Sequence, residues 1–498
     1  MVLQSPDADR SDASSRSTPS PRLERAGLGT ADLVFFVVAA AAPLTVVAGV
    51  VPLAIRTGGL SAAYGYLLPG LLLLLFATGF TAMSPRVRNA GAFYSYISHG
   101  LGRPWGVGAS YVAVISYNAM TICLLSGFAV YAHSALSNLF GLSVPWQLLA
   151  AAGLAGVGAL GYFRVTLGAR VLGAALGLEV LILVIYEVAV LIAGGRQGIT
   201  VDMFDPGVMS NPGFGAMLVL TAGGFIGFEA TAIYAEEVRD PERTIPRATY
   251  IAIGFLAVFY TFSVWCVFVA FGSDNALAYA AGDDVSALTF VSIKEYVGAW
   301  SSDAGQVLLM TSAFAATLAF HNAAARYHFT LAREGLLPRS FGRVSTRHGS
   351  PIGGVAVQVA VCLIVLGFAA IMGADPYLVV FLWSAAPGVI GILALEALTG
   401  VAVAAYFTRH PCEHSIWRVV VAPGIAAVGL TILVWLCLSQ LDLLTAAKPL
   451  VNWLLVLPLP LAFAVGLAQA VAIKRRDHDR YEQLNTMDVE RVEFTPEH

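Results

Sequence analysis

Long apolar runs recur along this chain and limit what it can fold into. A helix needs roughly 20 apolar residues to cross the hydrocarbon core of a bilayer, and the 498-residue sequence supplies many such runs. Only 12% of its residues are charged, against about 25% in an average soluble domain. The sequence therefore predicts an all-α integral membrane protein, with the lipid bilayer as its surroundings.

Twelve transmembrane helices can be placed along the chain. They cover approximately residues 31–55, 62–83, 105–132, 146–163, 169–194, 213–235, 248–272, 304–331, 352–373, 377–407, 417–438 and 449–473. With a cytoplasmic N-terminus, 24 of the 28 Lys and Arg residues fall on the cytoplasmic side, as the positive-inside rule requires. We expect a multi-pass protein of the cytoplasmic membrane with both termini in the cytoplasm.

Polar segments lie outside the spans. Residues 1–25 are rich in Ser, Pro and charge, a composition typical of a disordered tail, and residues 474–498 predict a second cytoplasmic tail. The long outer segment 273–303 is a candidate for a short interfacial helix.

For several classes of function, the sequence contains none of the expected motifs. The net charge of −3 indicates no nucleic-acid partner. The chain has no G-x-x-x-x-G-K-(S/T) motif, so an ATP-driven pump is not indicated. Its five cysteines are widely spaced and form no metal or disulfide pattern. We expect no cofactor, no metal and no enzymatic activity; a non-transporting membrane sensor or a membrane enzyme is the less favoured alternative.

The first span contains a proline. In "VVAAAAPLTVVAGVVP", Pro43 removes a backbone hydrogen bond and clashes with the carbonyl four residues earlier. Irregular backbone at membrane depth is tolerated where it lines a cavity or is covered by protein. A simple proline kink is the alternative. We expect residues 40–46 to depart from a continuous helix.

The sixth span combines glycines with an acid. "GGFIGFEATAIYAEEVRDPERTIPRA", residues 223–248, places three glycines just before Glu229. Close helix packing explains the glycines but not an acid that costs roughly 2.5–3.5 kcal/mol to insert. Interruptions at corresponding places in two five-helix halves indicate a midplane site in an inverted-repeat transporter. We expect residues 222–228 to be broken and to face the first break.

Two stretches also carry a family resemblance. Residues 223–248 resemble a signature of the amino acid–polyamine–organocation (APC) superfamily, and "RYHFTLAREGLLP", residues 326–338, resembles its second motif. The resemblance implies a secondary transporter of leucine-transporter-like architecture, with a 5+5 inverted repeat plus two extra helices. Its transporter domain would cover 26–473, with repeats at about 31–194 and 213–407 and extra spans at about 417–473.

The first span departs from the family pattern. Relatives have a glycine-rich G-S-G-I-F motif there, whereas this chain has Ala, Pro43, Leu44 and Thr45, with Gly49 nearby. Gly223 falls where some cationic amino-acid exchangers carry an aromatic gate. Glycine at this position implies a roomier pocket or a different gate.

The resemblance implies an amino acid or related amine as substrate. Substrate-binding residues would be Ala41, Ala42, Pro43, Leu44 and Thr45 in span one, and Gly223, Gly224, Phe225 and Gly227 in span six. The substrate carboxylate would meet half-helix amides near Pro43–Thr45, since helix N-termini favour anions. Its ammonium would meet carbonyls near 223–227. A polyamine or other amine without a carboxylate is the alternative.

Two acids are candidates for coupling transport to protons. The family motif places Glu229 beside the substrate, and Glu179 falls near a position where several proton-coupled relatives have a buried Lys. A low dielectric disfavours a charged carboxylate, so either residue could take up and release a proton. Sodium is the less favoured coupling ion. For Glu187 and Glu396 we expect structural hydrogen bonds between helices, and this is also the alternative for Glu179.

Charged residues follow span six. Glu236, Glu237, Arg243 and Arg247 are expected to pair with charged residues of neighbouring inner loops. Because ion pairs can differ between two conformations, we interpret these four residues as a gate.

Overall fold

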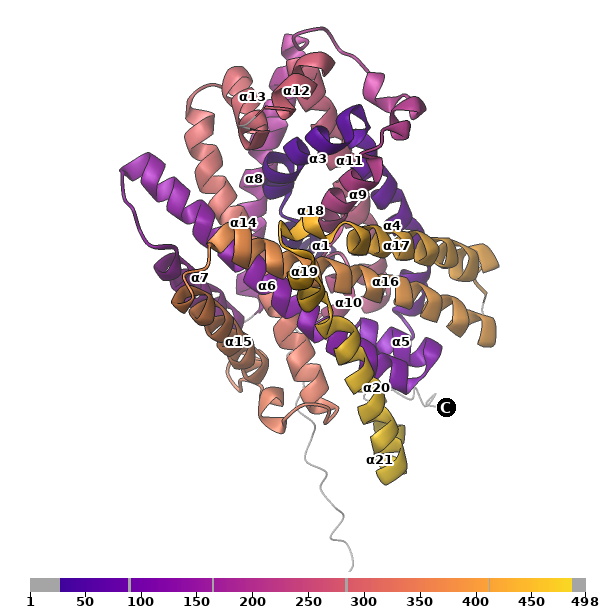
Figure 1. The fold of residues 1–498 in the computed structure, drawn as a ribbon. Coiled ribbons are helices and arrows are strands. Elements are labelled where there is room, and N and C mark those ends of the chain that lie inside the picture. The colour runs from indigo at the N-terminus through magenta and orange to yellow at the C-terminus, as the bar shows by residue number, and fades with distance from the viewer. Residues whose placement is uncertain (1–26, 88–90, 164, 283–284, 412, 486–498) are drawn as a thin grey trace, which may run out of the picture.

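A computed structural model describes residues 27–87, 91–163, 165–282, 285–411 and 413–485 (Figure 1). Within these ranges every secondary-structure element is a helix. The β-type pairing there is a single isolated bridge between Leu28 and Val238. The all-α prediction is confirmed. Residues 1–25, expected to be disordered, and 486–498 of the expected C-terminal tail lie outside the described ranges.

Up to Ala193 the described residues form eight α-helices. They are α1 (Thr30–Ala41), α2 (Pro43–Thr45), α3 (Val51–Gly58), α4 (Tyr64–Met83), α5 (Phe93–Leu101), α6 (Arg103–Phe140), α7 (Trp146–Tyr162) and α8 (Val165–Ala193). A π-helical stretch, Val46–Val50, joins α2 to α3, and a 3₁₀ turn, Gly59–Ala63, joins α3 to α4.

The chain continues with α9 (Phe214–Ala222), α10 (Ala230–Ile233), α11 (Pro241–Phe271), α12 (Ser273–Ala280), α13 (Leu288–Val297), α14 (Trp300–Arg333), α15 (Ile352–Ile371) and α16 (Leu382–Arg409). The last helices are α17 (Ala422–Ser439), α18 (Leu441–Thr445), α19 (Pro449–Val456), α20 (Pro458–Arg476) and α21 (His478–Gln483). Helices α12 and α13 confirm short helical structure in the segment 273–303.

Ten helical segments of the described chain are long and apolar enough to cross a membrane. The first, Thr30–Met83, is 54 residues long and contains the first two expected spans. The fourth expected span corresponds to α7, a shorter apolar helix of 17 residues. The chain is thus a multi-pass membrane protein, while the count of twelve and the inverted repeat stay predictions.

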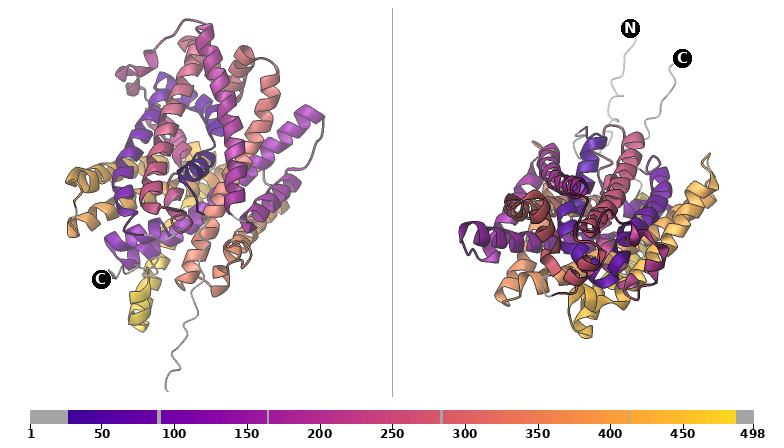
Figure 2. Two further views of the ribbon diagram at one scale, coloured as in Figure 1. Left: turned by 180° about the vertical axis from the view of Figure 1, so that it is seen from behind. Right: turned by 90° about the horizontal axis from the view of Figure 1, so that it is seen from above.

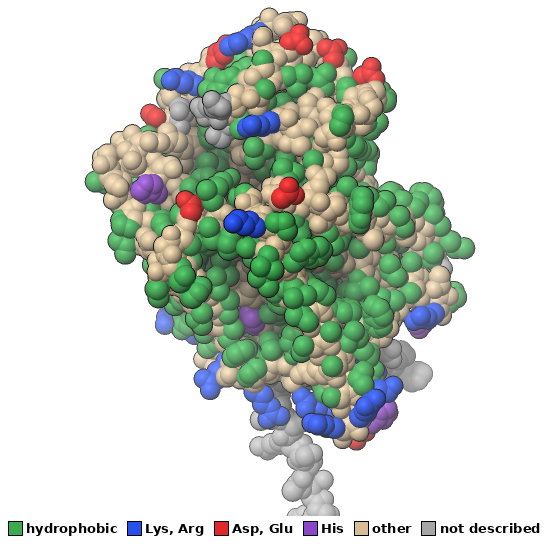
Figure 3. All heavy atoms as spheres, in the orientation of Figure 1, with side chains coloured by type: hydrophobic (Ala, Val, Ile, Leu, Met, Phe, Trp, Pro, Cys, Tyr) green, Lys and Arg blue, Asp and Glu red, His purple; other side chains and the backbone are tan. Residues whose placement is uncertain are grey.

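The helices form one bundle (Figure 2), in which α6 contacts α5, α14, α16 and α20. Large apolar side chains on the outside of the bundle are strongly exposed, including Ile192 (82%), Ile371 (85%) and Leu450 (73%). In Figure 3 hydrophobic side chains cover the middle of the visible face, and Lys and Arg gather at the end where α21 lies. This distribution suits a surface that meets lipid in its middle and water at its ends.

The segment after the last span is packed against the bundle. Tyr481 and Leu484 are buried in a small apolar cluster with Tyr94, Val107, Leu331, Leu336 and Ala470. Arg103 at the start of α6 donates to the carbonyl oxygen of Leu484 at 2.9 Å and pairs with Glu482 at 3.0 Å. Residues 477–485 therefore fasten the ends of α5, α6 and α14 together.

Candidate functional site

The first expected span is broken at Ala42. Helix α1 ends at Ala41, Ala42 is left-handed with φ 48°, and α2 begins at Pro43. Pro43 has no N–H to continue the helix and its ring crowds the preceding turn. A left-handed non-glycine residue costs on the order of 1–2 kcal/mol, so the surrounding packing must hold it. The predicted interruption within 40–46 is confirmed.

The sixth expected span is broken over the three glycines. After α9, a 3₁₀ turn covers Gly223–Phe225, Ile226 is extended, and Gly227 has φ 117°. Only glycine adopts that backbone conformation readily. Helical structure resumes at Ala230 with α10. The predicted interruption within 222–228 is also confirmed.

The two breaks lie against each other. A Cβ added to Gly227 would be only 2.7 Å from the Cβ of Ala40, so the close approach requires glycine. Tyr260 of α11 joins the two breaks, because its hydroxyl donates to the carbonyl of Ala41 at 3.1 Å and its ring meets Phe225 edge-on at 5.9 Å. The breaks therefore face each other as predicted, whereas their depth in the bilayer stays a prediction.

Glu229 follows the second break directly in the chain and is fully buried. Its Oε2 accepts the N–H of Gly227 at 2.8 Å, and its Oε1 accepts the hydroxyl of Tyr117 at 2.7 Å. Tyr117 of α6 stacks on Tyr327 of α14 with ring centroids 5.1 Å apart. The acid in span six thus supports the broken backbone and connects it to two other helices.

Glu179 reaches the first break from α8. Its Oε2 accepts the hydroxyl of Ser312 at 2.8 Å, and Ser312 accepts the hydroxyl of Thr45 at 3.3 Å. The carboxylate also lies within hydrogen-bonding reach of the backbone amide of Leu44. Sequence reasoning missed Ser312, because one serine in an apolar helix carries no distinguishing signal.

Glu187, two turns further along α8, has a different environment. Its Oε1 accepts the hydroxyl of Ser263 in α11 at 2.5 Å. The expected structural hydrogen bond between helices is confirmed for this residue. Glu396 in α16 is 1% exposed, but neither of its carboxyl oxygens has a hydrogen-bond partner among the described residues. The same prediction is therefore wrong for Glu396.

Two buried ion pairs follow span six. Arg326 donates to Glu237 at 2.6 and 2.9 Å, and Arg333 donates to Glu236 at 2.6 and 3.1 Å. All four side chains are at most 7% exposed, and both pairs have the two-pronged geometry in which arginine binds carboxylate best. The pairs connect the segment after α10 to α14, and both arginines belong to the stretch 326–338. Glu236 and Glu237 thus pair as expected.

Within the described residues, neither Arg243 nor Arg247 forms an ion pair with a neighbouring loop, which contradicts the prediction for both. Arg243 is exposed and approaches Asp240, three residues earlier, at 3.9 Å. Arg247 is exposed, and in the described chain it has no ion pair. The physical reason is helical periodicity: positions four apart share a face, and here that face of α11 points outward while Ile245 and Ala248 are buried.

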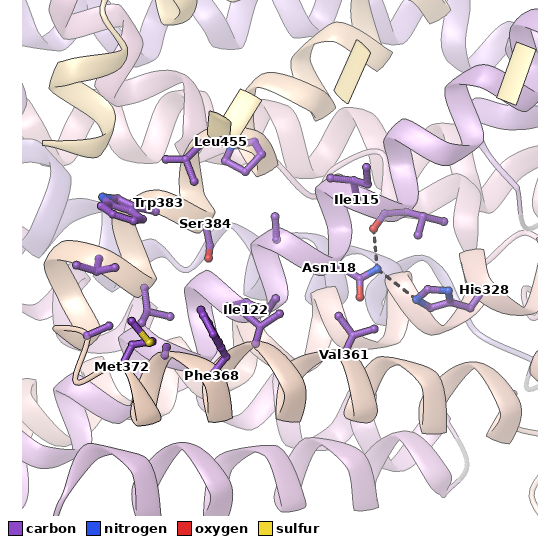
Figure 4. Close-up of a pocket in the computed structure, with 18 residues that line it drawn as sticks. Ile115, Asn118, Ile122, His328, Val361, Phe368, Met372, Trp383, Ser384 and Leu455 are labelled. Atoms are coloured by element: carbon purple, nitrogen blue, oxygen red, sulfur yellow. Dashed lines mark hydrogen bonds between the residues drawn. The ribbon is translucent and has the colours of Figure 1, made fainter. Parts of the chain in front are cut away.

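A cavity of about 750 Å³ lies away from the two breaks. Its lining from α6, α15 and α16 is almost entirely apolar, and a 3.2 Å hydrogen bond between Asn118 and His328 closes one end (Figure 4). Apolar lining residues look like ordinary core in a sequence, so nothing in the chain indicated this cavity. The described ranges also contain no group of three or more His, Cys, Asp or Glu side chains placed to hold a metal.

Comparisons with known proteins agree with this geometry. A family model described as "Amino acid permease" matches residues 28–459. The branched-chain amino acid permease BcaP of Lactococcus lactis is 26% identical over 63% of this chain and 70% of its own length. The methylthioribose transporter of Bacillus subtilis is 24% identical over 75% of this chain and 79% of its own. The low-affinity putrescine importer PlaP of Escherichia coli is 23% identical over 30% and 32%. The chain is therefore a transporter and not an enzyme, and it belongs to the amino acid permease family of the APC superfamily.

Proposed function

We propose that this permease is a secondary transporter that carries an amino acid or a related amine across the cytoplasmic membrane. The observation that supports this most is that two helices, one broken at Ala42 and the other at Gly227, lie against each other at their breaks. Broken helices leave backbone donors and acceptors without helical partners, which suits a small polar substrate. Relatives named for a branched-chain amino acid and for putrescine fit the same substrate class.

One observation favours the alternative substrate, an amine without a carboxylate. The substrate carboxylate was expected to meet amides near Pro43–Thr45, yet few are free. Pro43 has no N–H, the amide of Ala42 donates to Ala39, and the amide of Leu44 lies within reach of Glu179. An amine could instead use the carbonyls of the second break and the carboxylate of Glu229.

We assign gating to the pairs Glu236–Arg333 and Glu237–Arg326. A transporter must open and close each side of its site in turn, and bistable ion pairs suit that task. Both pairs join the end of the broken sixth span to α14, so in this conformation they hold that end of the site closed. The positive-inside pattern makes it the cytoplasmic end.

Glu179 and Glu229 are our candidates for proton coupling. Glu179 touches the first break through Ser312 and Thr45, and Glu229 holds the second break through Gly227. Adding a proton to either carboxyl removes an acceptor from one break, so protonation and the shape of the site would be linked. Sodium is the alternative, because carboxylate and hydroxyl oxygens are also ligands for hard cations.

Transport in liposomes tests the proposal. The purified protein would be reconstituted and given labelled branched-chain amino acids and putrescine under an imposed pH gradient or a sodium gradient. We expect uptake driven by the pH gradient and abolished by a proton ionophore. Glu229→Gln and Glu179→Gln should lose this response, with Glu187→Gln as the matched control. Sodium-driven uptake that ignores the ionophore and survives Glu229→Gln would refute proton coupling.

A further inference from the structure

The last turn of α14 supplies an arginine to the proposed gate. Arg333 is the final residue of that helix, and its guanidinium donates two hydrogen bonds to Glu236. Helix ends fray, and their last carbonyl groups need partners outside the regular helical pattern. The position of Arg333 therefore depends on what holds the residues that directly follow it.

The chain leaves α14 through a glycine cap. Gly335 has φ 71°, and its N–H donates to the carbonyl of Ala332 at 3.1 Å. The N–H of Leu336 donates to the carbonyl of Leu331 at 2.8 Å. These two hydrogen bonds form a Schellman motif, in which the side chains corresponding to Leu331 and Leu336 commonly pack together. The cap is complete only when this apolar contact is covered.

Residues 477–485, which we call the strap, hold the cap by polar contacts. The N–H of Asn485 donates to the carboxylate of Glu334 at 2.9 Å. The guanidinium of Arg480 donates to the carbonyl of Gly335 at 2.7 Å. A cation at the C-terminal end of a helix is also favoured by the helix dipole. The strap thus satisfies both residues that directly follow Arg333.

The strap covers the apolar part of the cap as well. Tyr481 and Leu484 are 7% and 1% exposed and belong to the same buried cluster as Leu331 and Leu336. Removal of these two strap side chains would expose the cap to water, which is unfavourable for apolar surface. A seated strap therefore stabilises the end of α14.

The strap has its own anchor on α6. Arg103 donates to the carbonyl oxygens of Glu482 and Leu484 at 2.8 and 2.9 Å. The strap therefore ties the end of α14 to α6. The second gate arginine, Arg326, lies eight residues before Glu334, about 12 Å further along the helix axis, so fraying of the last turn leaves Arg326 in place.

We infer that the strap is a latch for the gate. While it is seated, it fixes the last turn of α14 and keeps Arg333 in position to pair with Glu236. Its release frays that turn and weakens this pair, while Glu237–Arg326 remains. The inference rests on the proposed gating role of the two pairs and adds a regulatory segment to it.

Hydrogen–deuterium exchange on the full-length protein in nanodiscs tests the latch. Tyr481→Ala/Leu484→Ala unseats the strap and should speed amide exchange over residues 229–238 by about tenfold, because the segment opens more often. Leu461→Ala is the matched control, since it removes a leucine from α20 that is 56% exposed. That control should leave exchange over 229–238 unchanged.

Two backgrounds locate the effect. In Glu236→Gln the ion pair with Arg333 is already lost, so unseating the strap should add little to the exchange rate. In Glu237→Gln the pair with Arg333 is intact, so unseating the strap should speed exchange as much as it does in the wild type. Equal increments in the two backgrounds would overturn the latch.

The outcomes also separate the latch from the proposed gate. If Glu236→Gln leaves both exchange over 229–238 and uptake unchanged, the gating role of that pair fails. If Glu236→Gln alters them while the strap variant lowers only the melting temperature, the latch is overturned and the strap merely packs. Should the double variant not fold, Arg480→Ala serves instead, because that side chain is exposed. Exchange over 229–238 should then rise about twofold, and an unchanged rate would refute the latch.

Discussion

The pair Glu237–Arg326 offers a sharp test of the proposed gate. Glu237→Gln removes the charge that balances Arg326, whose side chain is only 3% exposed. Removing one partner of a buried ion pair costs about 3–5 kcal/mol, because the other charge stays buried and unpaired. That energy corresponds to a roughly hundredfold to several-thousandfold change in an equilibrium constant. We expect the described conformation to lose that much relative to alternatives in which Arg326 reaches water.

The chain supplies a matched control. Glu295 and Arg196 have the same closest distance, 2.6 Å, and also form two hydrogen bonds, but their side chains are 40% and 45% exposed. Solvent screening reduces such a pair to about 0–1 kcal/mol. Glu295→Gln should therefore change little.

Hydrogen–deuterium exchange in nanodiscs and the melting temperature would measure the difference. Glu237→Gln should speed amide exchange over residues 229–238 and lower the melting temperature, and Glu295→Gln should do neither. The double variant Glu237→Gln/Arg326→Gln should be less destabilised than Glu237→Gln, because no charge is left unpaired. Equal effects of the two single variants would refute the reasoning from burial.

Three further changes probe the breaks. Gly227→Ala should lower the free energy of unfolding by about 1–3 kcal/mol, because alanine is strained at φ 117°. The control Gly254→Ala has open space around it in α11 and should be neutral or stabilising. Equal melting temperatures of the two variants would contradict this. Ala42→Gly should preserve or raise the melting temperature, since glycine adopts the left-handed conformation without strain; a marked drop would show that the Ala42 methyl group matters more. Ser312→Ala removes the link between Glu179 and Thr45, so the dependence of uptake on the pH gradient should weaken while exchange persists; an unchanged gradient dependence would exclude that link from coupling.

Backbone chemistry made the two breaks predictable. Proline lacks an N–H and glycine adopts positive φ readily, so Pro43 and Gly227 are residues at which a helix can break. They do not force a break, since Pro69 lies inside the unbroken helix α4; the acid beside the three glycines made the difference at the sixth span. An acid among apolar residues likewise indicates a functional or structural site, and Glu229 is buried at the second break.

Partners across the fold were harder to predict, because they depend on how helices rotate and slide. The segment after span six holds acids and arginines close together in sequence, which suggested that all of them pair. Glu237 reaches Arg326 from the turn that follows α10, whereas the phase of α11 points Arg247 outward. The unpaired state of Glu396 is equally invisible in sequence, since it depends on what the surrounding helices fail to offer.

The packing of residues 477–485 also sets an order of events during synthesis. Arg103 and Leu484 are 381 residues apart in the chain, yet they are hydrogen-bonded. The apolar cluster around Tyr94, Leu331 and Leu336 cannot be covered until Tyr481 and Leu484 have left the ribosome. All the membrane helices are made before this end of the molecule can be completed. A ribosome that stops before residue 478 would thus release a chain whose spans are present but whose apolar cluster is left uncovered.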